Sequence, residues 1–233
     1  MALDRPLVAV DLPGHGHSDG GRNGSLGLAD NADDVATVMR VLAPEARCLV
    51  GMSLGGLTAL ALAARAPEVV PSLVLVDVTP GVDGQKASPI SAFINGPESF
   101  ASFDDILART VAFNPTRSEA SLRRGILHNA QQRPDGSWVW RYARFRALEP
   151  GSTAADRRVD FASLWDAVSG LDVPLLLVRG TTEQSVVDDA DEAELLRRCP
   201  LARVEHVEGA GHSIQGDRPV ELARLITDFV SSL

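Results

Sequence analysis

Cysteines are scarce in this sequence, and long apolar runs are absent. Of the 233 residues only Cys48 and Cys199 are cysteines, with neither C-x-x-C spacing nor a disulfide framework. That usage is typical of a reducing compartment. No apolar run is long enough to span a membrane, and the N-terminus lacks the basic-then-apolar order of a signal peptide. We therefore expect a cytoplasmic protein that does not use a membrane as its partner.

Positive charge is also limited. The chain has 22 Lys and Arg residues against 31 Asp and Glu residues, which gives a net charge of −9. This excess of negative charge argues against nucleic acid as the main partner. No G-x-G-x-x-G follows the first apolar run, which argues against a simple dinucleotide-binding domain. We expect a small-molecule substrate and no metal or cofactor, and whether the protein forms a homodimer stays open.

Short apolar runs alternate with amphipathic stretches over most of the chain, and this alternation predicts a parallel sheet flanked by helices. The runs predict strands that are buried on both faces. We expect strands at 7–10, 47–50, 72–76, 174–178 and 202–207. We expect helices that begin near Asp30 or Asn31, over 54–65, over about 188–198, and from Pro219 onward. The predicted fold class is therefore α/β.

The alternation stops between Pro80 and about Leu171. Helices are predicted there over 98–113 and 117–131, so the segment is most simply a helical lid inserted between two sheet strands. We therefore expect a core of residues 1–79 and 172–233 with a lid of residues 80–171. Trp138 and Trp140 lie in the lid and either line a substrate pocket or pack inside the lid itself.

The stretch Gly51-Met52-Ser53-Leu54-Gly55-Gly56 lies between a predicted strand and a predicted helix. Glycines two residues before and two residues after a serine permit a sharp turn that projects the serine hydroxyl. The helix begins at once, so the amide of Leu54 and the positive end of the helix dipole face the same space. Ser53 is therefore the candidate nucleophile, and the Leu54 N–H is the candidate donor to an oxyanion.

A serine nucleophile needs a base, and a carboxylate behind that base fixes its tautomer. His212 is the best of the five histidines, because it lies in a glycine-flanked loop after the last strand. His15 lies in the early glycine-rich loop, where it either contacts substrate or stabilises the turn. For the acid we favour Glu183, which follows the strand at 174–178. Asp77, at the end of the strand at 72–76, stays open.

Four motifs together resemble the α/β-hydrolase superfamily. They are D-L-P-G-H-G-H-S at 11–18, G-M-S-L-G-G at 51–56, L-V-L-V-D at 73–77 and G-A-G-H-S at 209–213. They occur in that family's order of serine, acid and histidine, and the resemblance covers nearly the whole chain. It implies the serine-nucleophile branch with a helical lid, which includes esterases, C–C bond hydrolases and haloperoxidase-like enzymes. The family's usual G-x-x-D acid position falls on Glu183, in Gly180-Thr181-Thr182-Glu183.

The front of the chain departs from the family pattern. The resemblance implies three strands before the one at 7–10, and a His-Gly segment that supplies a second oxyanion-hole amide. The sequence begins too late to contain them. We expect either that residues precede Met1 or that the strand at 7–10 pairs directly with the one at 47–50. With the Leu54 amide alone, the loss of one oxyanion donor costs on the order of 10² to 10³ in rate.

We therefore expect a serine hydrolase that acts through an acyl-enzyme on a small or medium apolar ester or a related carbonyl compound. The alternative is a small-molecule binding protein of the same fold that is catalytically weak or inactive because its oxyanion hole is incomplete. Comparing ester turnover by the wild type and by Ser53→Ala separates the two.

Overall fold

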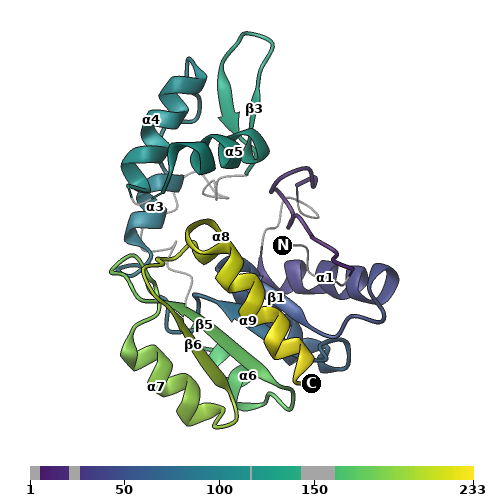
Figure 1. Cartoon of the computed structure of the whole chain (residues 1–233). Helices are drawn as coiled ribbons and strands as arrows, with labels where there is room; N and C mark the ends of the chain where they lie inside the picture. Colours follow the sequence, from purple (N-terminus) through teal and green to yellow (C-terminus); the bar gives the residue numbers. More distant parts are fainter. Residues whose placement is uncertain (1–5, 21–26, 116, 143–160) are drawn as a thin grey trace, which may run out of the picture.

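The computed structural model describes residues 6–20, 27–115, 117–142 and 161–233. Its centre is a sheet of four strands in the order β1-β2-β5-β6 (Figure 1). The strands are β1 (Leu49–Met52), β2 (Leu73–Val76), β5 (Leu175–Gly180) and β6 (Arg203–Val207). Every adjacent pair is parallel. The predicted α/β class with a mainly parallel sheet is confirmed.

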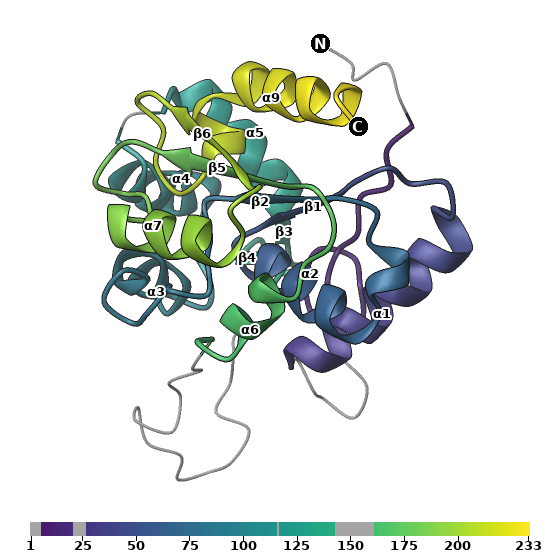
Figure 2. The same ribbon diagram turned by 90° about the horizontal axis from the view of Figure 1, so that it is seen from below.

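Helices cover the two faces of the sheet, as Figure 2 shows. One face carries α1 (Leu28–Leu42), α2 (Leu54–Arg65), α6 (Leu164–Ser169) and α7 (Asp189–Arg198), while α8 (Ile214–Asp217) and α9 (Pro219–Ser231) belong to the other. A short 3-10 helix over Pro67–Val69 follows α2.

Successive residues of the central strands alternate between these two layers. Leu73 and Leu75 pack in the core cluster with α1 and α2, whereas Val74 and Val76 pack in the cluster with α9. This alternation is the two-residue period of a strand. All four side chains are buried, and each contributes about 1.5–3 kcal/mol relative to exposure. Their burial fixes the register of β2 and so the position of the residue that follows it.

The helix boundaries follow local capping chemistry. Asp188 accepts a hydrogen bond from the Asp191 N–H, and the Asp191 carboxylate accepts one from the Asp188 N–H, which forms a capping box at the start of α7. Pro219 occupies the first turn of α9, as predicted. The expected start of α1 was wrong by a few residues, because Gly27 is its N-cap and Asp30 lies inside the helix.

The predicted strand at 7–10 is not formed. Residues 6–10 have no regular secondary structure, and Leu7 is 72% exposed. The predicted pairing with 47–50 is therefore wrong: among the described residues, β1 pairs only with β2 and forms an edge of the sheet. The physical reason is that an apolar run becomes a strand only where a neighbouring strand satisfies its N–H and C=O groups. Leu7–Val10 has no such partner in the described chain.

A second group of elements, which we call the extension (residues 88–142), lies beyond one end of the sheet (Figure 1). It contains α3 (Ser88–Ile94), α4 (Phe103–Phe113), α5 (Glu119–Asn129) and an antiparallel hairpin of β3 (Ala130–Gln132) and β4 (Trp138–Trp140). The two predicted helices are present in shortened form as α4 and α5. The hairpin was not predicted, because its strands have only three residues each.

The helix α6 lies within the range expected for the lid but packs on the core. Trp165 and Val168 of α6 belong to the same buried cluster as residues of α1 and α2. Residues 143–160, which connect the hairpin to α6, lie outside the described residues. Among the helices of the described residues, none combines the length and apolarity needed to cross a membrane.

Candidate active site

The candidate nucleophile lies at the sharp turn between β1 and α2. Ser53 has φ 51° and ψ −122°, which is strained for a residue with a side chain. Its carbonyl accepts hydrogen bonds from the N–H groups of Gly56 and Leu57 and so starts the helix. Leu54 is the first residue of α2, and its N–H therefore has no acceptor within the helix. The turn thus presents half-buried Ser53 beside a backbone donor that has no acceptor among the described residues.

Two glycines of this turn lie where no side chain fits. A Cβ at Gly51 would lie 2.5 Å from the Gly55 carbonyl oxygen and 2.6 Å from the Gly56 Cα. A Cβ at Gly56 would collide with the Val78 side chain. A Cβ at Gly55 would meet nothing within 4 Å. The close approach of β1 and α2 therefore requires Gly51 and Gly56, whereas Gly55 has room for a side chain.

Gly51→Ala is expected to lower the free energy of unfolding by about 1–3 kcal/mol, because the new methyl group meets rigid backbone. Gly55→Ala, the matched control, is expected to change it by less than about 1 kcal/mol, because alanine is the better helix former. Urea denaturation of the two variants measures both values. Equal losses of stability would contradict this account of the turn.

Asp77 lies directly after β2, one position past the pair Met52 and Val76 that ends the β1–β2 register. Its side chain is fully buried and its φ is 47°. Oδ1 accepts hydrogen bonds from the Gly180 N–H at 2.9 Å and the Ser185 hydroxyl at 2.6 Å. Oδ2 accepts one from the Val186 N–H at 3.1 Å. These donors stabilise an ionised carboxylate in a buried position.

His212 completes the hydrogen bonding of Asp77. Its Nδ1 lies 3.0 Å from Asp77 Oδ2, and its side chain is 11% exposed. An ionised carboxylate only accepts hydrogen bonds, so His212 Nδ1 carries the proton and donates it. The neutral ring then has its lone pair on Nε2, where a base needs it. The His212 N–H donates to the Gln184 carbonyl at 3.1 Å, which ties the histidine loop to the loop after β5.

Ser53 and Asp77 follow neighbouring parallel strands at the same residue level, so they lie at the same edge of the sheet. Adjacent strands are about 4.8 Å apart, and His212 contacts the second of these two residues. The Ser53 hydroxyl forms no hydrogen bond with any residue in the described part of the chain. Transfer of its proton to His212 requires the two side chains to approach to about 2.6–3.2 Å.

Glu183 was the carboxylate that the sequence favoured as the partner of His212, but the structure places Asp77 beside the histidine. Glu183 is exposed, and within the described chain no hydrogen bond connects it to His212. The loop of residues 180–186 instead supplies three donors to Asp77, through Gly180, Ser185 and Val186. Sequence reasoning missed Ser185 entirely. A serine a few residues beyond a strand is too common to have indicated it.

The early glycine-rich loop folds on itself and contacts the extension. His15 Nδ1 donates to the Pro13 carbonyl at 3.0 Å, which is the turn-stabilising alternative. The Gly16 N–H donates to the Arg141 carbonyl at 2.7 Å, and His15 forms an isolated antiparallel bridge with Tyr142. This loop therefore joins the core to the end of the hairpin. The contacts do not place His15 against Ser53 or Leu54.

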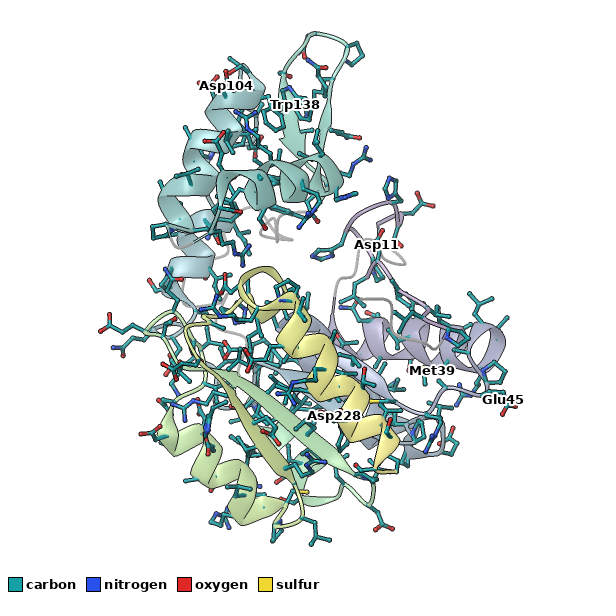
Figure 3. The ribbon with its side chains drawn as sticks, viewed as in Figure 1. Asp11, Met39, Glu45, Asp104, Trp138 and Asp228 are labelled. Carbon is teal, nitrogen blue, oxygen red and sulfur yellow. The ribbon has the colours of Figure 1, made fainter. Side chains whose placement is uncertain are left out.

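The two tryptophans that were candidate pocket residues pack inside the extension. The ring of Trp138 lies edge-on to Phe103 at 5.2 Å between centroids, and Figure 3 places it beside Asp104, at the end of the extension remote from the sheet. Trp140 contacts Phe93 and Phe100 and stacks on Tyr142. Trp138 therefore packs inside the extension, which is the second of the two alternatives. Trp140 likewise contacts other aromatic rings of the extension.

Other chemistries have weaker support at this site. In the described ranges no group of three or more His, Cys, Asp or Glu side chains is arranged to hold a metal ion. Cys48 precedes β1, at the opposite end of that strand from Ser53. Burial raises the pKa of its thiol, an effect only partly offset by its hydrogen bond with Ser72. A raised pKa disfavours the thiolate form that a cysteine nucleophile needs. Ser53 remains the candidate nucleophile of this edge of the sheet.

The family model and the relatives that match this chain indicate the same family. The model of the alpha/beta hydrolase fold matches residues 2–219. Esterase Rv0045c of Mycobacterium tuberculosis is 44% identical over 238 residues, which cover 98% of this chain and 76% of the relative. The 2-(acetamidomethylene)succinate hydrolase of Mesorhizobium japonicum is 30% identical over 226 residues, covering 97% of this chain and 78% of the relative.

Two solved structures also resemble the fold of this chain. A crystal structure of the M. tuberculosis esterase superposes with a TM-score of 0.78 at 43% identity, over 95% of this chain and 73% of that one. The structure of an E-2-(acetamidomethylene)succinate hydrolase also gives a TM-score of 0.78, at 28% identity, over 95% of this chain and 80% of that one.

Proposed function

Because the chain belongs to the α/β-hydrolase fold family, we propose that this hydrolase cleaves carboxylic esters through an acyl-enzyme on Ser53. The observation that carries the proposal is the hydrogen bond between buried Asp77 and His212 Nδ1, at the sheet edge where the Ser53 turn ends. It supports a triad of Ser53, His212 and Asp77, in which Asp77 takes the role that sequence reasoning gave first to Glu183.

The proposed reaction follows from these atoms. Ser53 Oγ attacks the ester carbonyl carbon while His212 Nε2 accepts the hydroxyl proton. Asp77 holds the ring in the required tautomer and stabilises the imidazolium that forms. The Leu54 N–H donates to the oxyanion. His212 then protonates the leaving alcohol, and a water molecule activated by the same ring releases the carboxylic acid and restores the serine.

The substrate class is proposed from the relatives. One relative is named an esterase, and a second is named a 2-(acetamidomethylene)succinate hydrolase. A third, from mouse and 28% identical, is named an sn-1-specific diacylglycerol lipase. These names support a carbonyl substrate, and the esterase supports an ester. We propose a small or medium apolar ester, held at the carboxyl ends of the strands with the extension acting as a lid.

A fluorophosphonate probe tests this proposal directly. Intact-mass analysis is expected to show one phosphonyl adduct on the wild type and none on Ser53→Ala. A p-nitrophenyl ester is expected to give a burst of one equivalent of p-nitrophenol where deacylation is slower than acylation. Turnover by a protein that the probe does not label, or equal labelling of Ser53→Ala, would refute a serine acyl-enzyme.

The same experiment separates the alternative function. A catalytically inactive binding protein of this fold predicts a folded wild type that is neither labelled nor able to turn the ester over. One observation favours this alternative. In the described chain β1 forms an edge of the sheet, and beside Ser53 the Leu54 N–H is the one backbone donor placed for an oxyanion. The turnover of the wild type decides between the two functions.

A further inference from the structure

One arginine of the extension reaches the loop that carries His212. Arg117 lies between α4 and α5, and its Nε donates to Asp217 Oδ1 at 2.7 Å. Its Nη2 donates to the Ser213 carbonyl at 3.1 Å. The two side chains are largely buried, at 17% exposed for Arg117 and 10% for Asp217. Figure 1 shows α8, which ends at Asp217, at the end of the core that faces the extension.

The ion pair holds the loop on both sides of the histidine. Asp217 Oδ2 accepts a hydrogen bond from the Gly211 N–H at 3.0 Å, and Arg117 binds the Ser213 carbonyl. Gly211 and Ser213 are the residues directly before and after His212. The backbone on either side of the proposed base is therefore fixed by one charged pair, half of which belongs to the extension.

The contact surface under Arg117 is shaped for a guanidinium group. A Cβ at Gly216 would collide with the Arg117 Cζ and would lie 2.5 Å and 2.6 Å from its two terminal nitrogens. The planar group therefore lies against the bare backbone of α8. A planar fork that makes two directed hydrogen bonds is a property of arginine that lysine does not reproduce. The close approach of Arg117 to Gly216 is a second observation, independent of the hydrogen bonds, that the guanidinium group fits against α8.

We propose that Arg117 and Asp217 are positioning residues, which couple the seating of the extension to the orientation of His212. The proposal rests on the proposed ester hydrolysis. Removing Arg117 leaves the buried Asp217 carboxylate without its cation and the Ser213 carbonyl without one of its donors. The loop then shifts, and a displacement of about 1 Å in a catalytic group costs on the order of 10² in rate. The effect acts on the base and leaves Ser53 in place.

Steady-state hydrolysis of p-nitrophenyl acetate by wild type, Arg117→Met and Arg117→Lys tests the coupling. We expect Arg117→Met to lower kcat about 10- to 100-fold with KM changed by less than about threefold. Arg117→Lys restores part of the loss, because it keeps the charge and one hydrogen bond. Fluorophosphonate labelling of Ser53 is expected to slow by a similar factor and still reach completion.

Arg123→Met is the matched control. It removes the same charge from the same extension, where Arg123 pairs with Glu119 at 2.7 Å and, among the described residues, forms no hydrogen bond or ion pair with the histidine loop. Its kcat is expected to stay within about twofold of the wild type. The double variant Arg117→Met/Asp217→Asn is expected to lose less than the product of the two single losses, as residues in one network do.

The outcomes distinguish this inference from the proposed function. An active wild type with a folded Arg117→Met of unchanged kcat, or with an equal loss in Arg123→Met, overturns the coupling and leaves ester hydrolysis standing. If Arg117→Met fails to fold by circular dichroism, Asp217→Asn carries the test, because it removes the charge that pairs with Arg117. An unchanged kcat in a folded Asp217→Asn then overturns the coupling equally. A folded wild type without labelling or turnover refutes the proposed function and the coupling with it.

Discussion

Ser53→Ala is expected to lower the kcat for ester hydrolysis by a factor on the order of 10⁵ to 10⁶. In the proposed mechanism the hydroxyl supplies the attacking oxygen, and no other nucleophile lies at this turn in the described structure. The fold is expected to persist, because the Ser53 hydroxyl makes no hydrogen bond with the described residues. The strained backbone at φ 51° is retained with either side chain. Steady-state kinetics with active-site titration measures the loss, and thermal unfolding checks the fold.

The proposed proton transfer from Ser53 to His212 gives a second prediction. His212→Ala is expected to cost about as much as Ser53→Ala, and the double variant no more than either, because a nucleophile and its base act as one unit. Losses that multiply in the double variant would mean that the two residues act independently. A residual kcat of His212→Ala within tenfold of the wild type would exclude it as the base.

Asp77→Asn is expected to lower kcat by about 10⁴ while Glu183→Gln leaves it within about twofold. In the asparagine variant, one oxygen is replaced by an NH₂ group that cannot accept from His212 Nδ1–H. The ring must then take the other tautomer, with its proton on Nε2 and no base facing the serine. Kinetics of the two variants at the same pH decides between the two carboxylates.

The stability of Asp77→Asn and Glu183→Gln is measured together with their activity. Asp77 accepts four hydrogen bonds in the core of the site, so Asp77→Asn is expected to lose some stability as well as activity. Glu183 is exposed and its substitution is expected to be neutral in both respects. If Glu183→Gln lost the activity and Asp77→Asn kept it, His212 would have to change partner in the working enzyme.

The sequence by itself determined the turn at Ser53 and the class of fold around it. These features are local: glycines permit a sharp reversal, a short apolar run predicts a buried strand, and the amphipathic stretch after it predicts a helix. The position of His212 in a glycine-flanked loop after the last strand is local in the same sense. Each of these inferences depends on residues within about ten positions of one another.

Only the tertiary structure decided which carboxylate meets the histidine. Asp77 and His212 are 135 residues apart, and their contact depends on the order β1-β2-β5-β6 and on the register of each pair. The position of β1 at the edge of the described sheet and the contact of Arg117 with the histidine loop depend on tertiary structure in the same way. A residue pattern encodes backbone preference, whereas such contacts depend on how layers formed by distant segments pack together.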